Sequence, residues 1–180
     1  MNGTLSGLCL WLTGLCCSGK STTARGLAEQ FQKMGRQVTL LDGDVVRARL
    51  SGELGFSKAD RQTHVRRVAF VAAEVVRHGG IAICAVVSPY QAMRAHARQM
   101  FDPGKFIEIY MDTALELCEQ RDVKGLYAKA RKGQVLAFTG VSDPYESPLN
   151  PELVLRTEDR SVEKNIQQVL NYLSERLHIA

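Results

Sequence analysis

The chain has 180 residues, of which 45% are hydrophobic and 23% charged, with a formal net charge of +4 at pH 7. These values are ordinary for a soluble protein, and they fit a single domain spanning residues 1–180. The longest apolar runs, such as residues 81–87, are too short to cross a membrane, and residues 1–14 lack the basic region and long apolar core of a secretory signal. We therefore expect a cytoplasmic protein without a membrane partner.

Cysteine usage and basic residues narrow the classes further. The five cysteines form no Cys-x-x-Cys pair, and Cys16 and Cys17 are sequence neighbours, a poor geometry for a disulfide or a zinc site. Reduced thiols fit a cytosolic setting. Basic residues gather around Arg61 and between Arg121 and Lys132, without the interleaved aromatic side chains of a nucleic-acid platform. We expect no nucleic-acid partner and favour small anionic substrates.

Apolar runs and helical periodicity alternate along the chain. Strands are predicted at residues 8–13, 38–41, 81–87, 106–111 and 153–155. Helices are predicted from the glycine-rich loop to Gly35, from the Ser57–Asp60 capping pattern to residue 79, from Pro89, at 114–120 and over 162–173. This alternation predicts a three-layer α/β fold, with a parallel five-stranded sheet and helices on both faces.

One segment breaks the alternation. Residues 121–152 mix charge and glycine with three of the five prolines. A stretch this irregular inside a compact domain is usually a functional lid. We refer to residues 121–152 as the lid.

The motif GLCCSGKS (Gly14–Ser21) has the full spacing of a phosphate-binding loop, and it lies between a predicted buried strand and a helix. Backbone N–H groups of such a loop and the start of its helix hold phosphate oxygens, and its lysine adds a positive charge. A tight turn without a ligand is the alternative. We predict a P-loop fold with Lys20 catalytic, Ser21 as a Mg²⁺ ligand, and ATP bound by Gly14, Leu15, Cys16, Cys17, Ser18, Gly19, Lys20, Ser21 and Thr22.

An acidic pair follows the second predicted strand as Asp42-Gly43-Asp44, whereas the third strand ends in Ser88-Pro89 and offers no carboxylate. This placement is typical of small-molecule kinases, where one carboxylate accepts the hydroxyl proton and another helps to hold Mg²⁺. We predict that Asp42 and Asp44 are catalytic residues and metal ligands. A plain Asp-Gly turn is the alternative.

Cationic groups lie near this pair. Arg47 is three residues past Asp44, and Arg61 and His64 are one helical turn apart. Positive charge near the acceptor indicates that the acceptor is itself anionic. Lys124 begins a series of basic residues on the lid that can close over the transferred phosphate.

Taken in order, these segments resemble the adenylylsulfate (APS) kinases over residues 8–173. The matching segments are GLCCSGKST, LDGDVVR, LGFSKADR, VRRVAFVA, SPY, RDVKGLYAKAR, FTG and DPYESPLNPE. Many families share the phosphate-binding loop, but the ordered set LDGD, LGFS, DVKGLY and FTG is far more specific. The resemblance implies Mg²⁺-dependent transfer of the ATP γ-phosphate to the 3′-hydroxyl of adenylyl sulfate, giving 3′-phosphoadenylyl sulfate and ADP in sulfate assimilation. It also implies a homodimer, in some cases associated with or fused to an ATP sulfurylase.

The resemblance also implies roles for individual residues. It places Asp44 near the acceptor hydroxyl and the metal. It implies that Arg47 and Arg61 hold the phosphosulfate and that Phe56 and Phe138 sandwich the acceptor adenine, as aromatic rings stack on bases. Further substrate contacts implied by the resemblance are Lys124 and Leu126.

Two positions carry more than one interpretation. Ser88 matches a serine proposed as a phosphoserine intermediate in some members and is predicted to be catalytic and to contact substrate, yet its place before Pro89 also fits a helix N-cap. His64 stands where many members have an acceptor-contacting asparagine, and we expect it to alter acceptor affinity or to add pH dependence.

Two other functions compete with this hypothesis. One is a P-loop kinase for another small anionic acceptor, such as a sugar acid or a nucleotide, although a sugar acid offers no ring to Phe56 and Phe138. The other is a nucleotide-binding regulatory domain without turnover. The presence of Lys20, Asp42 and Asp44 disfavours it.

Overall fold

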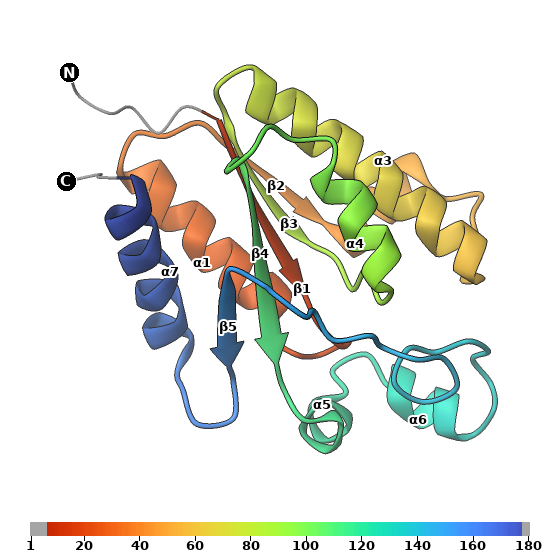
Figure 1. The fold of residues 1–180 in the computed structure, drawn as a ribbon. Coiled ribbons are helices and arrows are strands. Elements are labelled where there is room, and N and C mark those ends of the chain that lie inside the picture. The colour runs from red at the N-terminus through yellow and green to blue at the C-terminus, as the bar shows by residue number, and fades with distance from the viewer. Residues whose placement is uncertain (1–6, 178–180) are drawn as a thin grey trace.

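The computed structural model describes residues 7–177, and its core is a parallel sheet of five strands. The strands are β1 (Leu8–Thr13), β2 (Val38–Asp42), β3 (Ile81–Ala85), β4 (Phe106–Asp112) and β5 (Leu153–Arg156). Their order is β2-β3-β1-β4-β5, with β1 in the centre. The predicted α/β fold with five strands is confirmed, and the carboxyl ends of all five strands meet at one edge of the sheet (Figure 1).

Helices cover both faces of the sheet, as the alternation predicts (Figure 1). They are α1 (Lys20–Lys33), α2 (Gly43–Leu50), α3 (Lys58–Arg77), α4 (Gln91–Arg98), α5 (Leu115–Arg121), α6 (Leu126–Arg131) and α7 (Val162–Leu177). Helices α1 and α7 lie on one face, and α3 and α4 lie on the other. Helix α7 ends near the beginning of β1, at the opposite end of the molecule from α5 and α6.

The central strand shows why its sequence is continuously apolar. Leu8, Leu10 and Leu12 pack into the core beneath α1 and α7, whereas Cys9 and Trp11 pack into the core beneath α3 and α4. Successive side chains of a strand point to opposite faces, so a strand covered on both sides is apolar along most of its length, here up to Thr13 at its end. All six residues of β1 are buried.

Helix starts depart from the sequence expectations in two places. The Asp-Gly step after β2 is not a free turn: Asp42 accepts a hydrogen bond from the Asp44 N–H at 3.1 Å and caps α2, a helix that the sequence analysis did not predict. The N-cap interpretation of Ser88 is wrong, because α4 begins at Gln91 behind Tyr90 and uses no side-chain cap. The cap at Ser57 is confirmed, since its hydroxyl accepts from the Asp60 N–H at 3.2 Å.

Two smaller differences have a local cause. β3 ends at Ala85, two residues before the predicted end, because the next residues turn away from the sheet and Ser88 takes a φ of 38°. The first helix is predicted to run to Gly35, but α1 ends at Lys33, and Met34 is its C-cap and is 56% exposed.

The lid is packed rather than extended. Tyr127 and Ala130 of α6 form a third apolar cluster with Cys118 of α5 and with Phe138, and Leu15 of the phosphate-binding loop packs against it. The lid therefore lies beside the carboxyl edge of β1. Over residues 7–177, no helix is both long enough and apolar enough for a membrane span.

Candidate active site

A cavity of about 770 Å³ opens at the carboxyl edge of the sheet. The glycine-rich loop, the β2–α2 connection, the start of α3, the lid and the start of α7 all contribute to its wall. The predicted site residues that line it are Cys16, Cys17, Gly19, Lys20, Ser21, Thr22, Asp42, Asp44, Arg47, Phe56, Arg61, His64, Ser88 and Lys124. Gly14, Leu15, Ser18, Leu126 and Phe138 are not part of the wall.

The glycine-rich loop connects β1 directly to α1. Gly14 and Gly19 have φ values of 146° and 95°, a region that side chains rarely adopt. A Cβ atom at Gly14 would lie 2.8 Å from the Met111 carbonyl oxygen, so the loop passes too close to β4 for any other residue. Gly19 precedes α1 without a side-chain cap, so the backbone supplies the polar groups of this helix start.

Lys20 is buried within the loop that it follows. Its ammonium donates to the carbonyls of Gly14, at 3.0 Å, and Leu15, and to the Ser18 hydroxyl at 3.4 Å. Burial lowers the pKa of Lys20 below its ordinary value. The loop thus holds one positive charge where its backbone turns, which suits an anion that brings several oxygens.

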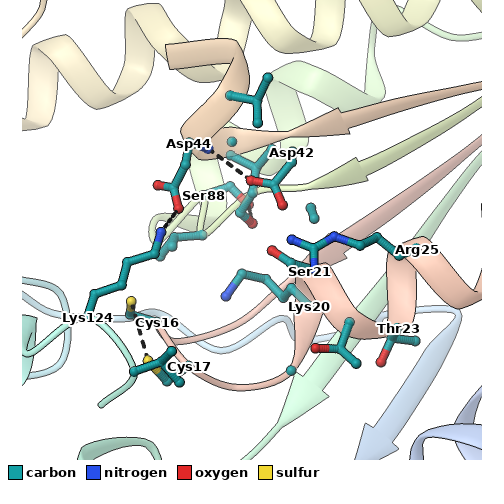
Figure 2. Close-up of a pocket in the computed structure, with 18 of the residues that line it drawn as sticks. Cys16, Cys17, Lys20, Ser21, Thr23, Arg25, Asp42, Asp44, Ser88 and Lys124 are labelled. Atoms are coloured by element: carbon teal, nitrogen blue, oxygen red, sulfur yellow. Dashed lines mark hydrogen bonds and ion pairs between the residues drawn. The ribbon is translucent and has the colours of Figure 1, made fainter. Parts of the chain in front are cut away.

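The acidic pair lies across the cavity from α1. Figure 2 shows Asp42 and Asp44 on one side of the cavity and Ser21 with Lys20 on the other. Lys124 of the lid forms an ion pair with Asp44. The hydroxyl of Ser21 and the two carboxylates are oxygen donors of the kind that Mg²⁺ takes, usually with water and phosphate in the remaining positions. No cluster of three or more acidic, histidine or cysteine ligands occurs in residues 7–177.

The opposite wall is cationic and aromatic. The Arg47 guanidinium donates to the Gly55 carbonyl at 2.9 Å and lies 4.7 Å from the centre of the Phe56 ring. Arg61 donates to the Phe56 carbonyl at 3.0 Å and, from Nη2, to the Ala137 carbonyl at 2.7 Å. Burial lowers the pKa of both guanidinium groups. The two arginines therefore flank an aromatic ring that is 54% exposed.

Phe138 lies elsewhere. It is 9% exposed and packs edge-on against Tyr127, with ring centres 4.9 Å apart. Leu126 packs against the same lid cluster. This structure brings Phe56 to the cavity but places Phe138 behind its wall, so the two rings do not form a sandwich here. The preceding residue, Ala137, nevertheless accepts a hydrogen bond from Arg61 at its carbonyl oxygen.

His64 is buried on α3 beneath this wall. Its Nδ1 lies 3.0 Å from the Ser51 hydroxyl. Burial, followed by the positive charges of Arg47 and Arg67, lowers the pKa of His64 to about 4. The expected pH dependence therefore moves into the acid range, well below neutral pH.

Sequence reasoning missed a set of polar contacts beside the glycine-rich loop. Arg121 donates to the Thr157 carbonyl at 2.8 Å and to the Cys17 carbonyl at 3.3 Å, which joins the end of α5 to the residue after β5. Figure 2 also shows Arg25, one turn after Ser21, extending along the cavity. Arg25 shares the helix face of Ser21 by its i+4 spacing, but the contact of Arg121 with Thr157 depends on topology and has no local signal.

A parallel sheet with a phosphate-binding loop between its central strand and a helix, an acidic pair after the edge strand β2, and a lid beside both define a P-loop kinase that acts on a small molecule. The comparisons narrow this class. The family model described as "Adenylylsulphate kinase" matches residues 6–156. The adenylyl-sulfate kinase of Synechococcus sp. (strain JA-3-3Ab) is 50% identical over 167 residues, covering 93% of this chain and 94% of the relative.

Two solved structures agree with this match. The Mycobacterium tuberculosis APS kinase CysC, in complex with AMPPNP and APS, has a TM-score of 0.89 and 40% identity, over 94% of this chain and 98% of that chain. The hexameric APS kinase from Thiobacillus denitrificans has a TM-score of 0.75 and 38% identity, over 99% of this chain and 31% of that one. The chain belongs to the adenylylsulphate kinase family, and its activity is the ATP-dependent phosphorylation of adenylyl sulfate to 3′-phosphoadenylyl sulfate.

Proposed function

We propose that the cavity binds Mg-ATP and adenylyl sulfate side by side and transfers the γ-phosphate directly to the 3′-hydroxyl of the acceptor. The single observation that carries this proposal is the arrangement of the cavity walls. Lys20 and Ser21 face Asp42 and Asp44 across it, and the Arg47–Phe56–Arg61 wall adjoins the acidic pair. Transfer of a phosphoryl group needs mainly such positioning and charge compensation.

The phosphate side takes the nucleotide in this proposal. Backbone N–H groups of residues 14–22 hold the phosphates, and Lys20 turns its ammonium from the loop carbonyls to phosphate oxygens. Ser21, Asp42 and Asp44 would hold Mg²⁺, which supplies charge compensation on the phosphates when bound. The buried cationic loop and the facing oxygen donors support this assignment.

The acceptor side takes adenylyl sulfate. Arg47 and Arg61 hold its phosphosulfate, Phe56 stacks on its adenine, and Asp44 accepts the proton of the 3′-hydroxyl. Lys124 exchanges its ion pair with Asp44 for an anionic substrate group. Phe138, Leu126 and His64 complete the predicted acceptor contacts, the first two by a movement of the lid.

Ser88 contributes position rather than covalent chemistry in this proposal. Its hydroxyl accepts from the Trp11 indole N–H at 3.1 Å and donates to the Thr13 hydroxyl at 3.0 Å, so both contacts hold it towards β1. We also propose that the protein is a homodimer. We propose a cytoplasmic location as well, which the five free cysteine thiols support. An association with ATP sulfurylase stays a prediction.

The test is ADP release from Mg-ATP with adenylyl sulfate, and with gluconate, shikimate, AMP or no acceptor as controls. We expect turnover with adenylyl sulfate alone and its loss in Asp44→Ala. Turnover with another acceptor would contradict the assignment of the acceptor wall. Binding of ATP without any turnover would favour the non-catalytic alternative.

A further inference from the structure

The turn that follows β3 is held in an unfavourable conformation at the cavity wall. Ser88 lines the cavity, is 1% exposed and has a φ of 38°, a left-handed value that residues with a Cβ atom adopt at a cost. Such a conformation persists only where surrounding contacts fix it. Figure 2 places Ser88 among the residues that surround the acidic pair.

The hydroxyl of Ser88 is fixed from the central strand. Thr13 donates its own proton to the Val87 carbonyl at 2.7 Å, so its oxygen is left to accept from Ser88. The Trp11 indole donates to the Ser88 oxygen from the other side. Two residues of β1, directly before the glycine-rich loop, thus hold the side chain of this turn.

The backbone of Ser88 is fixed from α4, by Arg94. This guanidinium is buried, at 3% exposure, and uses all three of its nitrogens. Nε donates to the Glu108 carboxylate on β4 at 2.8 Å, Nη1 to the Ser88 carbonyl at 2.7 Å, and Nη2 to the Glu146 carbonyl of the lid at 2.6 Å. Only the planar fork of an arginine reaches three acceptors in fixed directions.

The lid is joined to the same cluster at a second point. The Arg94 guanidinium lies 5.7 Å from the ring centre of Tyr145, and the Tyr145 hydroxyl lies 3.0 Å from the Thr13 hydroxyl. Since Thr13 gives its proton to Val87, the tyrosine is the donor in this contact. Arg94 therefore contacts the Ser88 turn, Glu146 of the lid and Glu108 of the sheet. Tyr145 in turn contacts Thr13, the last residue before the glycine-rich loop.

We infer that Arg94 is a positioning residue for phosphoryl transfer. It fixes the Ser88 turn and the end of the lid at Tyr145 and Glu146 relative to β1, the strand that leads into the glycine-rich loop. It does not line the cavity, so its effect passes through Ser88 and the lid. A displacement of about 1 Å in an aligned pair of reactants can cost about 100-fold in rate. The inference rests on the proposed acceptor side of the cavity, since that is the wall that Ser88 and the lid complete.

The test compares Arg94→Lys with Arg98→Lys. Arg98 lies one turn further along α4, pairs with the same Glu108 and also with Glu152, but has no hydrogen bond to Ser88 or Glu146. Both variants keep the charge and weaken the same ion-pair network. We expect Arg94→Lys to lower kcat/KM for adenylyl sulfate by about 10- to 100-fold, with the Kd for ATP changed less than about twofold. We expect Arg98→Lys to lose a similar amount of thermal stability while keeping kcat/KM within about threefold.

Several outcomes would overturn the inference. One is a loss of activity that follows the loss of stability equally in both variants, and another is an equal weakening of ATP and adenylyl sulfate in Arg94→Lys. If Arg94→Lys does not fold, Tyr145→Phe removes only the hydroxyl that reaches Thr13 and keeps the ring beneath Arg94. Unchanged kinetics in Tyr145→Phe would then contradict the positioning role. Wild-type turnover of adenylyl sulfate separates all of these results from a failure of the proposed function.

Discussion

The two sides of the cavity are built in different ways. The phosphate side consists of consecutive residues, in which glycine backbones and a helix start place Lys20 and Ser21, and distant side chains such as Arg121 only donate to carbonyls of the loop. The acceptor side joins Arg47, Phe56 and Arg61 to the lid carbonyl of Ala137, through side chains that donate to backbone oxygens. A local motif therefore specifies one side, whereas tertiary packing specifies the other. Changes on the two sides should affect different kinetic constants.

The largest effect is expected on the phosphate side. Lys20→Ala removes the one cation buried in the loop and should lower kcat by about 10³-fold, because charge that is placed for the transition state has the largest catalytic effect. Steady-state kinetics with both substrates measure it, with Lys33→Ala on the last turn of α1 as the control. A loss below about tenfold would show that the backbone alone stabilises the phosphates.

The second prediction concerns the free energy of unfolding and tests His64, which is buried behind the exposed residues of the acceptor wall. The pKa of His64 falls from 6.5 to about 4 on folding, so the unfolded chain binds the proton more tightly. The stability that His64 contributes is complete above pH 6.5 and is lost as the pH falls towards 4, by about 3 kcal/mol. His64→Asn should flatten this part of the stability curve. Denaturant unfolding at pH 7, 5.5 and 4 measures it, and parallel curves for the two proteins would contradict it.

The third prediction tests whether the acceptor wall acts on one substrate only. Arg61→Ala removes a guanidinium that holds both the Phe56 and Ala137 carbonyls, and loss of a charge-assisted hydrogen bond costs about 2 kcal/mol, or about 30-fold. We expect this loss in kcat/KM for adenylyl sulfate and not in the Kd for ATP. Arg66→Ala, at an exposed position of the same helix, is the matched control. Equal losses for both substrates would remove the distinction between the two sides.

The smallest effect should come from the exposed ring. Phe56→Leu keeps an apolar side chain but loses the flat face for stacking, and we expect the KM for adenylyl sulfate to rise about fivefold, since such contacts contribute about 1 kcal/mol. Phe70→Leu changes a ring of similar exposure, 60% against 54%, on the outer part of α3. An identical KM in the two variants would argue against adenine stacking at Phe56.

The same contrast explains what the sequence could predict. The strands and the glycine-rich loop follow from residues close together in the chain, and four of the five strands are predicted to within one residue at each end. Helix α2 was missed because Asp-Gly is usually a turn signal, whereas here the Asp42 side chain caps a helix. Because Asp42 acts as an N-cap, α2 begins at the position where the sequence indicates a turn.

Residues whose place depends on the lid could not be predicted in the same way. Phe138 carries no local feature to show that it packs against Tyr127 rather than facing the cavity. Arg94 resembles any basic residue of a surface helix, yet it is buried because acceptors from β4, the Ser88 turn and the lid converge on it. Convergence of three distant segments is a property of topology rather than of local sequence.

The placement of the chain's described ends has a practical consequence. Helix α7 ends and β1 begins at the end of the molecule opposite α5 and α6 (Figure 1). A fluorescent reporter or an immobilisation tag joined there leaves lid movement unobstructed. The proposed lid motion can thus be followed by energy transfer from a terminal donor to an acceptor dye on Leu136, an exposed lid residue outside the cavity wall, while the enzyme turns over on a surface.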